Sequence, residues 1–262
     1  MVHEPTYSKG YWPEHVLIVT GAGSGIGRQI SLGAARHGAT VICCDIADTV
    51  EETVQMIHDE DGSAQGIVGD ITDVAVVDKV VETAQATGKK LLMANNAGVM
   101  DKFEGAADLD TALLDKLMHV NFYAPFYFIR KVVPIMIAQG GGAITNTASA
   151  AGIRGAAAGA AYTSSKHALV GLTRNTAYTY AKQGIRCNAV APGGVSTNMM
   201  APENMADVNP ESGLNALSPI HMGALRPSKA EEISVAILYL LSPEASSING
   251  VILPIDNGWS AG

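Results

Sequence analysis

The stretch Val16-Leu17-Ile18-Val19-Thr20-Gly21-Ala22-Gly23-Ser24-Gly25-Ile26-Gly27 decides the fold. A short apolar run, typical of a strand, leads directly into closely spaced glycines, and a helical pattern follows over Gln29–His37. Glycines let the backbone turn sharply and let a pyrophosphate approach main-chain N–H groups, while the N-terminus of the next helix favours its negative charge. Glycine spacing alone is weak evidence, but its place between a strand and a helix predicts a dinucleotide-binding turn. The predicted contacts in this turn are Gly21, Ser24, Gly25, Ile26 and Gly27.

The rest of the chain repeats the same alternation of short apolar runs and longer amphipathic stretches. Strands separated by helical patterns predict a mostly parallel sheet covered on both faces, which is the doubly wound α/β class with a Rossmann-type arrangement. No repeat or linker divides this pattern, so we expect a single domain. The expected strands are His15–Thr20, Thr40–Cys44, Gly66–Gly69, Leu91–Ala94, Ala143–Thr147, Arg186–Ala191 and Gly250–Pro254.

Two segments fall outside the alternation. Residues 1–14 are polar, carry Pro5 and Pro13, and are expected to form an exposed arm ahead of a catalytic domain at 15–262. Residues 197–227 lack clear periodicity and are rich in Met, Asn and Pro, which makes them a candidate lid rather than a separate domain.

Composition limits the kinds of partner. A formal net charge of -8 opposes binding to nucleic acid phosphates or to an anionic membrane surface. No apolar run approaches the length of a membrane span, and no signal peptide is evident, so a cytoplasmic protein acting on small molecules is expected. The cysteines, Cys43, Cys44 and Cys187, lie in apolar stretches, and the seven histidines are scattered, so we expect no catalytic metal.

Asp45 ends the second expected strand, about twenty residues beyond the glycine turn. A carboxylate at this place accepts hydrogen bonds from the adenosine ribose hydroxyls and repels a 2′-phosphate by up to roughly 4 kcal/mol at an effective dielectric near 20. No Arg or Lys stands beside Asp45 in the sequence or within the turn. Asp45 and the adjacent Ile46 therefore predict NAD as the cofactor.

The pattern Tyr-x-x-x-Lys occurs three times, so spacing alone does not identify a site. Tyr162/Lys166 begins a long helical pattern after a run of small residues, and Ser149 follows the strand Ala143–Thr147, so both can converge on one cleft. Tyr178/Lys182 lies near the other end of the same helix, on the order of 24 Å away, and is expected to be structural or at a subunit surface. Tyr127/Lys131 has aromatic neighbours and is expected to serve in packing.

From Val16 to Trp259 the chain resembles the short-chain dehydrogenase/reductase family. The resemblance rests on motifs in the family's order: Thr20-Gly21-x-x-x-Gly25-x-Gly27, Asp70-Ile71, Asn95-Asn96-Ala97-Gly98, Asn121, Ser149, Tyr162-x-x-x-Lys166 and Pro192-Gly193-x-x-x-Thr197. Departures are Lys90, near a position that is often Asp, Ala148, where a second Ser is frequent, and Asn257, where Gly is common.

The resemblance implies roles for further residues. Asp70 and Ile71 would contact adenine, and Asn121 would hold a water relay to Lys166. The cofactor groove would be lined by Asn96, Ala97 and Gly98, with Pro192, Gly193, Val195 and Thr197 at the nicotinamide end. It also implies homodimers or homotetramers packed through the helices that contain Asn121 and Tyr162.

The predicted function is hydride transfer between NAD(H) and a secondary alcohol or ketone. Tyr162 is the expected acid/base, Lys166 is expected to lower its pKa and position the ribose, and Ser149 is expected to stabilise the substrate oxygen. The alternatives are a 3-oxoacyl-[acyl-carrier-protein] type reductase, a non-catalytic NAD-sensing protein, and an epimerase or lyase that uses tightly held NAD.

A small or medium apolar substrate is expected, because small residues flank Ser149 and Tyr162 and the candidate lid is apolar. The apolar lid residues are Met199, Met200, Met205, Leu214, Leu217 and Met222, which could instead pack into the domain or a subunit interface. Glu203, Asp207 and Glu211 flank them and are expected to repel anionic substrates.

Overall fold

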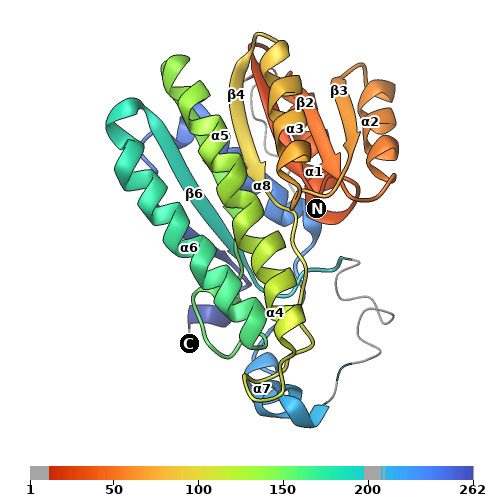
Figure 1. Cartoon of the computed structure of the whole chain (residues 1–262), viewed down its shortest axis with the longest axis vertical. Coiled ribbons are helices and arrows are strands. Elements are labelled where there is room, and N and C mark those ends of the chain that lie inside the picture. The colour runs from red at the N-terminus through yellow and green to blue at the C-terminus, as the bar shows by residue number, and fades with distance from the viewer. Residues whose placement is uncertain (1–11, 198–207, 209, 262) are drawn as a thin grey trace.

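The computed structural model describes residues 12–197, 208 and 210–261 of the chain (Figure 1). Its centre is a seven-stranded sheet in the order β3-β2-β1-β4-β5-β6-β7, in which each neighbouring pair is parallel. The strands are β1 (His15–Thr20), β2 (Thr40–Asp45), β3 (Ser63–Val68), β4 (Lys90–Asn95), β5 (Gly142–Thr147), β6 (Ile185–Pro192) and β7 (Ile252–Ile255).

Helices cover both faces of this sheet. One face, in front in Figure 1, carries α3, α5 and α6, and the opposite face carries α1, α2 and α8. The helices are α1 (Gly25–Arg36), α2 (Val50–Asp59), α3 (Val74–Ala86), α4 (Thr111–Met118), α5 (Ala124–Ala138), α6 (Ala160–Tyr180), α7 (Leu214–His221) and α8 (Ala230–Leu241).

The two hydrophobic cores follow from strand geometry. Successive side chains of a strand point to opposite faces, so Leu17 and Val19 of β1 pack towards α1 and α8, whereas Val16 and Ile18 pack towards α3 and α5. A strand buried on both faces needs an uninterrupted apolar sequence, which is why β1 reads as a continuous run. The predicted single-domain Rossmann-type fold is confirmed in its architecture.

The order of strands places the site. The chain winds from β1 outward to β3, then returns to β4 on the other side of β1, with Val19 in register with Ala94. Ligands of open α/β sheets bind beyond the carboxyl ends of the strands at such a reversal. The loops that follow β1 and β4 therefore meet at the expected place.

Two expected strand boundaries were wrong. The third strand runs from Ser63 to Val68 rather than over Gly66–Gly69. It lies at the edge of the sheet and is only half-buried, so polar Ser63 and Gln65 alternate with buried residues and the apolar signal begins late. The last strand begins at Ile252, because Gly250 takes a left-handed conformation with φ of 80°.

The expectation of an exposed arm over residues 1–14 fails at its end. Trp12 is fully buried, donates its backbone N–H to the His37 oxygen at 3.0 Å, and packs edge-on against the His37 ring. Residues 1–11 lie outside the described part of the chain. The body of the protein thus begins before His15.

The candidate lid is partly helical. Leu214 and Leu217 lie on α7, so the segment that lacks periodicity in sequence contains an eight-residue helix with Pro219 inside it. Met222, just after this helix, is 84% exposed. Met199, Met200, Glu203, Met205 and Asp207 lie outside the described residues.

Candidate active site

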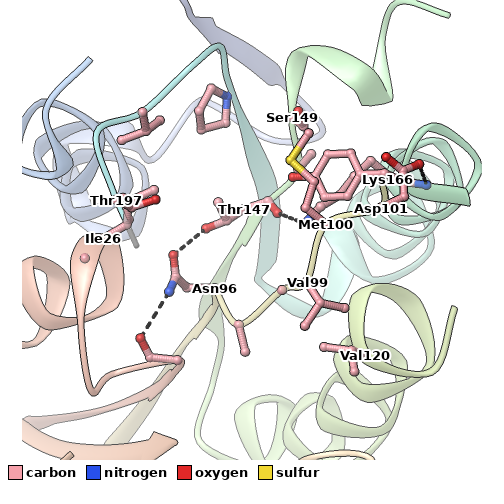
Figure 2. A pocket seen from close by; sticks show the side chains of 18 of the residues that line it. Ile26, Asn96, Val99, Met100, Asp101, Val120, Thr147, Ser149, Lys166 and Thr197 are labelled. Carbon is pink, nitrogen blue, oxygen red and sulfur yellow. Dashed lines mark hydrogen bonds between the residues drawn. The ribbon is translucent and has the colours of Figure 1, made fainter. Parts of the chain in front are cut away.

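A pocket of about 1200 Å³ opens at the carboxyl ends of the central strands. Its walls come from the glycine turn after β1, from the loops after β2, β3, β4, β5 and β6, and from the end of α7. Figure 2 shows part of this lining, from Ile26 and Asn96 to Ser149 and Lys166. Every residue predicted for the site lines this pocket except Gly27 and Asn121. The lining includes Gly21, Ser24, Gly25, Ile26, Asp45, Ile46, Asp70, Ile71, Asn96, Ala97, Gly98, Ser149, Tyr162, Lys166, Pro192, Gly193, Val195 and Thr197.

The glycine turn has the shape that a pyrophosphate needs. Gly21 has a φ of 68°, and a Cβ there would lie 2.9 Å from the Cα of Ala97. Gly27 packs directly against the backbone of this turn, because a Cβ on Gly27 would lie only 1.9 Å from the Gly21 carbonyl oxygen. Ser24 caps α1 without a side-chain hydrogen bond, and the first turn holds no acidic residue. The first N–H groups of α1 are therefore available to an anion, so the residues present fit a dinucleotide.

Polar contacts join the ends of β1 and β4 across the reversal. The Thr20 hydroxyl accepts hydrogen bonds from the backbone N–H groups of Asn96 and Ala97 at 3.0 and 3.1 Å. Asn96 donates its amide to the Thr20 carbonyl oxygen at 3.1 Å. It accepts from the Thr147 hydroxyl at 3.2 Å (Figure 2). Asn96 thus fixes the floor of the pocket between the glycine turn and the end of β5.

Asp45 lies beside the glycine turn. Its carboxylate accepts from the Gly23 N–H at 2.8 Å and from the Ala47 N–H at 3.0 Å. No Arg or Lys stands beside Asp45 in the sequence or within the turn, but Arg28 of α1, which directly follows the turn, reaches the Gly23 carbonyl in the structure. Its guanidinium also pairs with Glu52 at 2.8 Å. Arg28 was missed because it lies one turn along the helix, outside the glycine motif itself.

Tyr162, Lys166 and Ser149 meet at the opposite wall of the pocket. Tyr162 is in the first turn of α6, and Lys166 follows one turn later with its Nζ 5.4 Å from the centroid of the tyrosine ring. Lys166 donates to the Thr147 carbonyl oxygen at 2.8 Å. Ser149, at the end of β5, hydrogen-bonds the Tyr162 hydroxyl and accepts from the Ala151 N–H at 3.1 Å. A strand end and a helix start converge here as the sequence predicts.

Burial dominates the acid–base behaviour of this group of residues. It raises the pKa of Tyr162 to about 12, although the hydrogen bond from Ser149 acts in the opposite direction. It lowers the pKa of Lys166 to about 8. Burial thus opposes the lowering of the Tyr162 pKa that was expected from Lys166 and the positive nicotinamide ring, and that expectation stays a prediction.

Asn121 lies behind the pocket. It is buried within a π-helical turn, His119–Tyr123, that joins α4 to α5. Its amide oxygen accepts from the Val99 N–H at 2.9 Å, and its Nδ2 donates to the Val99 oxygen at 2.9 Å and to the Ser165 hydroxyl at 3.0 Å. Asn121 thus connects the loop after β4 to α6, while the water relay predicted for it stays a prediction.

The other two Tyr-x-x-x-Lys pairs do not line the pocket. Tyr178 is 90% exposed on α6. Lys131 pairs with Asp78 of α3 at 2.6 Å, and Tyr127 lies among aromatic rings of the same segment.

Sequence reasoning missed an aromatic wall at the far end of the pocket. The His221 ring lies 5.6 Å from that of Phe103 and 5.7 Å from that of Trp259, edge-on in both cases. The Trp259 indole donates to the Ile220 oxygen at 2.7 Å, which ties the chain end to α7. These three residues are far apart in sequence, so no spacing could have brought them together. The buried carboxylate of Asp101, which also lines the pocket, was missed for the same reason.

Asn257, where the resembled family commonly has Gly, has a φ of 57°. Asparagine tolerates this left-handed region better than most residues, and its Nδ2 also donates to the Ser228 hydroxyl at 3.2 Å. Asn257 can therefore adopt the left-handed backbone conformation that glycine would adopt at this position.

The described part of the chain offers neither a metal-binding cluster nor a membrane-spanning helix. Residues 12–197, 208 and 210–261 contain no group of three or more His, Cys, Asp or Glu side chains placed to hold a metal ion. None of the helices in these ranges combines the length and apolarity required to cross a membrane.

Comparison with known proteins places the chain in a family. A family model described as enoyl-(acyl carrier protein) reductase matches residues 21–260. The short-chain dehydrogenase/reductase cdmF of Talaromyces verruculosus is 35% identical, over 96% of this chain and 99% of its own. The 3beta-hydroxysteroid dehydrogenase 2 of Eggerthella lenta is 37% identical, over 93% and 94%. The chain belongs to the short-chain dehydrogenase/reductase family and is an oxidoreductase.

Solved structures agree with this assignment. The crystal structure of levodione reductase superimposes with a TM-score of 0.86 at 35% identity, covering 96% of this chain and 99% of that chain. Among similar structures, a Mycobacterium paratuberculosis short-chain dehydrogenase (28% identity, TM-score 0.86, 97% and 100% covered) is bound to NAD. A putative gluconate 5-dehydrogenase of Beutenbergia cavernae (34% identity, TM-score 0.83, 99% and 100% covered) holds NADP at low occupancy. The family thus uses a nicotinamide cofactor of either kind.

Proposed function

We propose that the protein transfers hydride between NAD(H) and an apolar secondary alcohol or ketone. The observation that carries this proposal is the meeting of Ser149, Tyr162 and Lys166 on one wall of a pocket whose other end is the glycine turn. A cofactor bound along the pocket from the turn would present its nicotinamide beside these three residues.

The cofactor supplies the hydride acceptor or donor, and the chain's residues handle the proton. Tyr162 exchanges a proton with the substrate oxygen through its hydroxyl. Ser149, hydrogen-bonded to that hydroxyl, holds the same oxygen in place and stabilises its developing charge. Lys166, buried one turn away and anchored on the Thr147 carbonyl, supplies the positive charge that favours the phenolate.

Asp45 supports NAD rather than NADP. Its carboxylate lies against the glycine turn, where a ribose 2′-phosphate would meet a negative charge at close range. Arg28 does not offset this charge freely, since its guanidinium is already bonded to the Gly23 carbonyl, Thr53 and Glu52.

The substrate end supports an apolar, ring-shaped substrate. Phe103, His221 and Trp259 form one wall, and Met100 and Ala157 lie beside them in the pocket lining. Flat aromatic faces and edges favour broad apolar surfaces over extended polar chains. The relative named for 3beta-hydroxysteroid, a ring-bearing secondary alcohol, is in line with this reading.

Reduction of an acyl group on a carrier protein is a second candidate. The description of the matching family model favours it, and Lys116 in the pocket lining is a cation that could meet an acidic partner.

One kinetic panel tests both functions. NADH formation or consumption is followed with apolar cyclic and polyhydroxylated secondary alcohols, with the matching ketones and with acyl-carrier-protein thioesters, each with NAD(H) and NADP(H). The proposal expects the highest kcat/KM for cyclic ketones or alcohols with NAD(H). Activity confined to carrier-bound thioesters would favour the second candidate, and activity with NADP(H) alone would contradict the assignment of Asp45.

A further inference from the structure

Asp101, in the loop after β4, places a buried carboxylate under the first turn of α6. Its side chain is 4% exposed, and none of the sequence motifs includes it. One oxygen accepts from the backbone N–H groups of Phe103 at 3.1 Å and Gly159 at 3.2 Å, and the other accepts from the N–H of Tyr162 at 2.8 Å. Asp101 lines the pocket next to Met100, its neighbour in sequence (Figure 2).

The fit between this loop and α6 is tight. A Cβ on Gly159 would lie 2.5 Å from the Asp101 carboxylate and 2.8 Å from the Glu104 nitrogen, so only glycine is accommodated there. The Ala160 N–H donates to the Glu104 oxygen at 2.8 Å. Phe103 adopts a left-handed φ of 63°, which few non-glycine residues accept without support. Asp101 supplies that support through its bond to the Phe103 N–H.

Two functional parts of the pocket are therefore fixed by one side chain. Tyr162 carries the hydroxyl of the proposed proton transfer, and Phe103 packs against His221 in the aromatic wall. We propose that Asp101 is a positioning residue that sets the place of the Tyr162 hydroxyl relative to the substrate wall. The inference rests on the proposed function for the role of Tyr162.

The charge of Asp101 also acts on Tyr162. The ionisable or hydrogen-bonding groups near Tyr162 are Ser149 from the end of β5, Lys166 on α6, Asp101 from the loop after β4, and His221, whose ring is bonded to the Ala157 oxygen. Glu104, in the same loop as Asp101, accepts from the Ala160 N–H through its backbone oxygen, and the hydrophobic residues packed with Tyr162 include Leu117 and Ala161. The negative charge of Asp101 raises the pKa of Tyr162, in the same direction as burial. Asp101 thus makes Tyr162 a stronger proton acceptor once it is ionised.

Other helix caps in the chain are built differently. Asp73 and Asp110 each accept one N–H at the start of α3 and α4, and both bonds are exposed. Burial raises the pKa of Asp101, whereas the three N–H donors act to lower it, so the carboxylate is kept in an unfavourable environment. A simple cap does not need such a position.

The test compares Asp101→Asn with Asp110→Asn as a matched control. Asparagine keeps one acceptor oxygen, but it loses the charge and cannot accept from the Tyr162 N–H on its Nδ2 side. For Asp101→Asn we expect kcat to fall about tenfold and the substrate KM to rise several-fold, because a small displacement of reacting groups costs rates of this order. The dissociation constant of NAD should change less than about twofold, since Asp101 does not contact the glycine turn. Asp110→Asn should leave all three unchanged.

A second readout does not need activity. The absorbance of tyrosinate is measured against pH for each protein and for the same protein carrying Tyr162→Phe. The difference between the two curves reports the ionisation of Tyr162 alone. In Asp101→Asn the transition should move to lower pH by roughly 0.5–1 unit, and the alkaline limb of the kcat/KM profile should move with it. Asp110→Asn should show no shift.

The outcomes separate the two proposals. An unshifted Tyr162 titration, or equal losses in NAD and substrate binding with reduced thermal stability, would show that Asp101 is only structural and would overturn the inference. A wild type that oxidises or reduces none of the panel would contradict the proposed function, while the titration would still decide whether Asp101 acts on Tyr162.

Discussion

A single hydroxyl separates Tyr162 from phenylalanine, and the proposed mechanism assigns proton transfer to it. Tyr162→Phe should lower kcat by two to four orders of magnitude, because general acid–base catalysis contributes this much. This loss corresponds to a rise of about 3–5 kcal/mol in the activation free energy. NAD binding, measured by calorimetry, should remain within a few-fold of wild type. A variant that retains full turnover would exclude Tyr162 as the acid/base.

Tyr178→Phe is the control for this prediction. It alters the same residue type in another Tyr-x-x-x-Lys pair on the same helix, at a side chain that is 90% exposed. Its kcat and KM should match those of wild type. If Tyr178→Phe were the inactive variant, the site would have been assigned to the wrong pair.

Asp45 is expected to decide the cofactor. Asp45→Ala removes the negative charge beside the glycine turn and the acceptor for the Gly23 N–H. The ratio of kcat/KM for NAD to that for NADP should fall by roughly 10- to 100-fold, chiefly because NAD binds less well and the 2′-phosphate is admitted. Asp48→Ala, which changes a nearby exposed carboxylate, should leave the ratio unaltered.

Lys166 is predicted to lower the stability of the protein at neutral pH. The pKa of Lys166 is about 8 in the folded protein, against 10.5 for an exposed lysine. Between these pH values the unfolded chain binds more protons than the folded protein, so the stability of the wild type rises with pH. Lys166→Met should be inactive, yet more stable than wild type by about 1–3 kcal/mol at neutral pH in the absence of cofactor.

Thermal unfolding at several pH values checks this prediction. The advantage of Lys166→Met should shrink as the pH rises from about 8 towards 10.5, because wild-type lysine becomes neutral in the folded state. The raised pKa of Tyr162 affects stability only above the ordinary tyrosine value of 10, so the comparison is made below that pH. A constant difference across this range, or a variant less stable at neutral pH, would show that burial of the ammonium is not the main cost.

At the level of elements, the sequence specifies strands buried on both faces better than strands at an edge. β1 and β2 contain continuous apolar runs, and β5 is buried over five of its six residues; all three were predicted to within one residue. β3 mixes polar and apolar residues because one side of it is exposed, so its start was missed. α7 was read as aperiodic because it is only eight residues long and contains Pro219.

The same limit applies to the site. The glycine turn, Asp45 and the Tyr162/Lys166 pair are local patterns, so spacing and context were enough to predict them. Asp101, the aromatic wall and the reach of Arg28 to Gly23 depend on loops from different strands meeting in space. Residues in contacts of this kind are far apart in the sequence, so no sequence pattern predicts them.

Two helical glycines allow a prediction about α1 and α6. Gly27→Ala should destabilise the fold by about 2–4 kcal/mol and weaken NAD binding, because the new Cβ would overlap the Gly21 carbonyl oxygen. Gly171→Ala, the same change at a helical position with open space around it, should stabilise the protein by about 0.5–1 kcal/mol. Denaturant unfolding of both variants measures the contrast. Equal effects would mean that the turn is not as closely packed as described.

At the scale of the whole molecule, exposed aromatic side chains on one helical layer indicate how copies would associate. Aromatic side chains gather where α4 joins α5: the Phe122 and Tyr123 rings lie 5.3 Å apart, and Tyr123 stacks on Tyr127 at 6.3 Å. Tyr123 is 40% exposed and Phe126 is 37% exposed. Clustered exposed aromatic residues are typical of protein interfaces.

We therefore predict that the protein forms a homodimer or homotetramer through this aromatic surface, defined by Phe122, Tyr123, Phe126 and Tyr127. Phe126→Glu places a charge in the predicted interface and should weaken association by roughly 100-fold or about 3 kcal/mol, as expected for an interface anchor. Met56→Glu is the matched control, because Met56 is 43% exposed but lies on α2, on the opposite face of the sheet. Sedimentation velocity over a range of concentrations should show an oligomer for wild type and Met56→Glu, and a shift towards monomer for Phe126→Glu. A monomeric wild type, or dissociation by Met56→Glu instead, would contradict this assignment.

Since the aromatic surface adjoins the π-helical turn that holds Asn121, loss of association should also lower kcat more than it changes NAD binding.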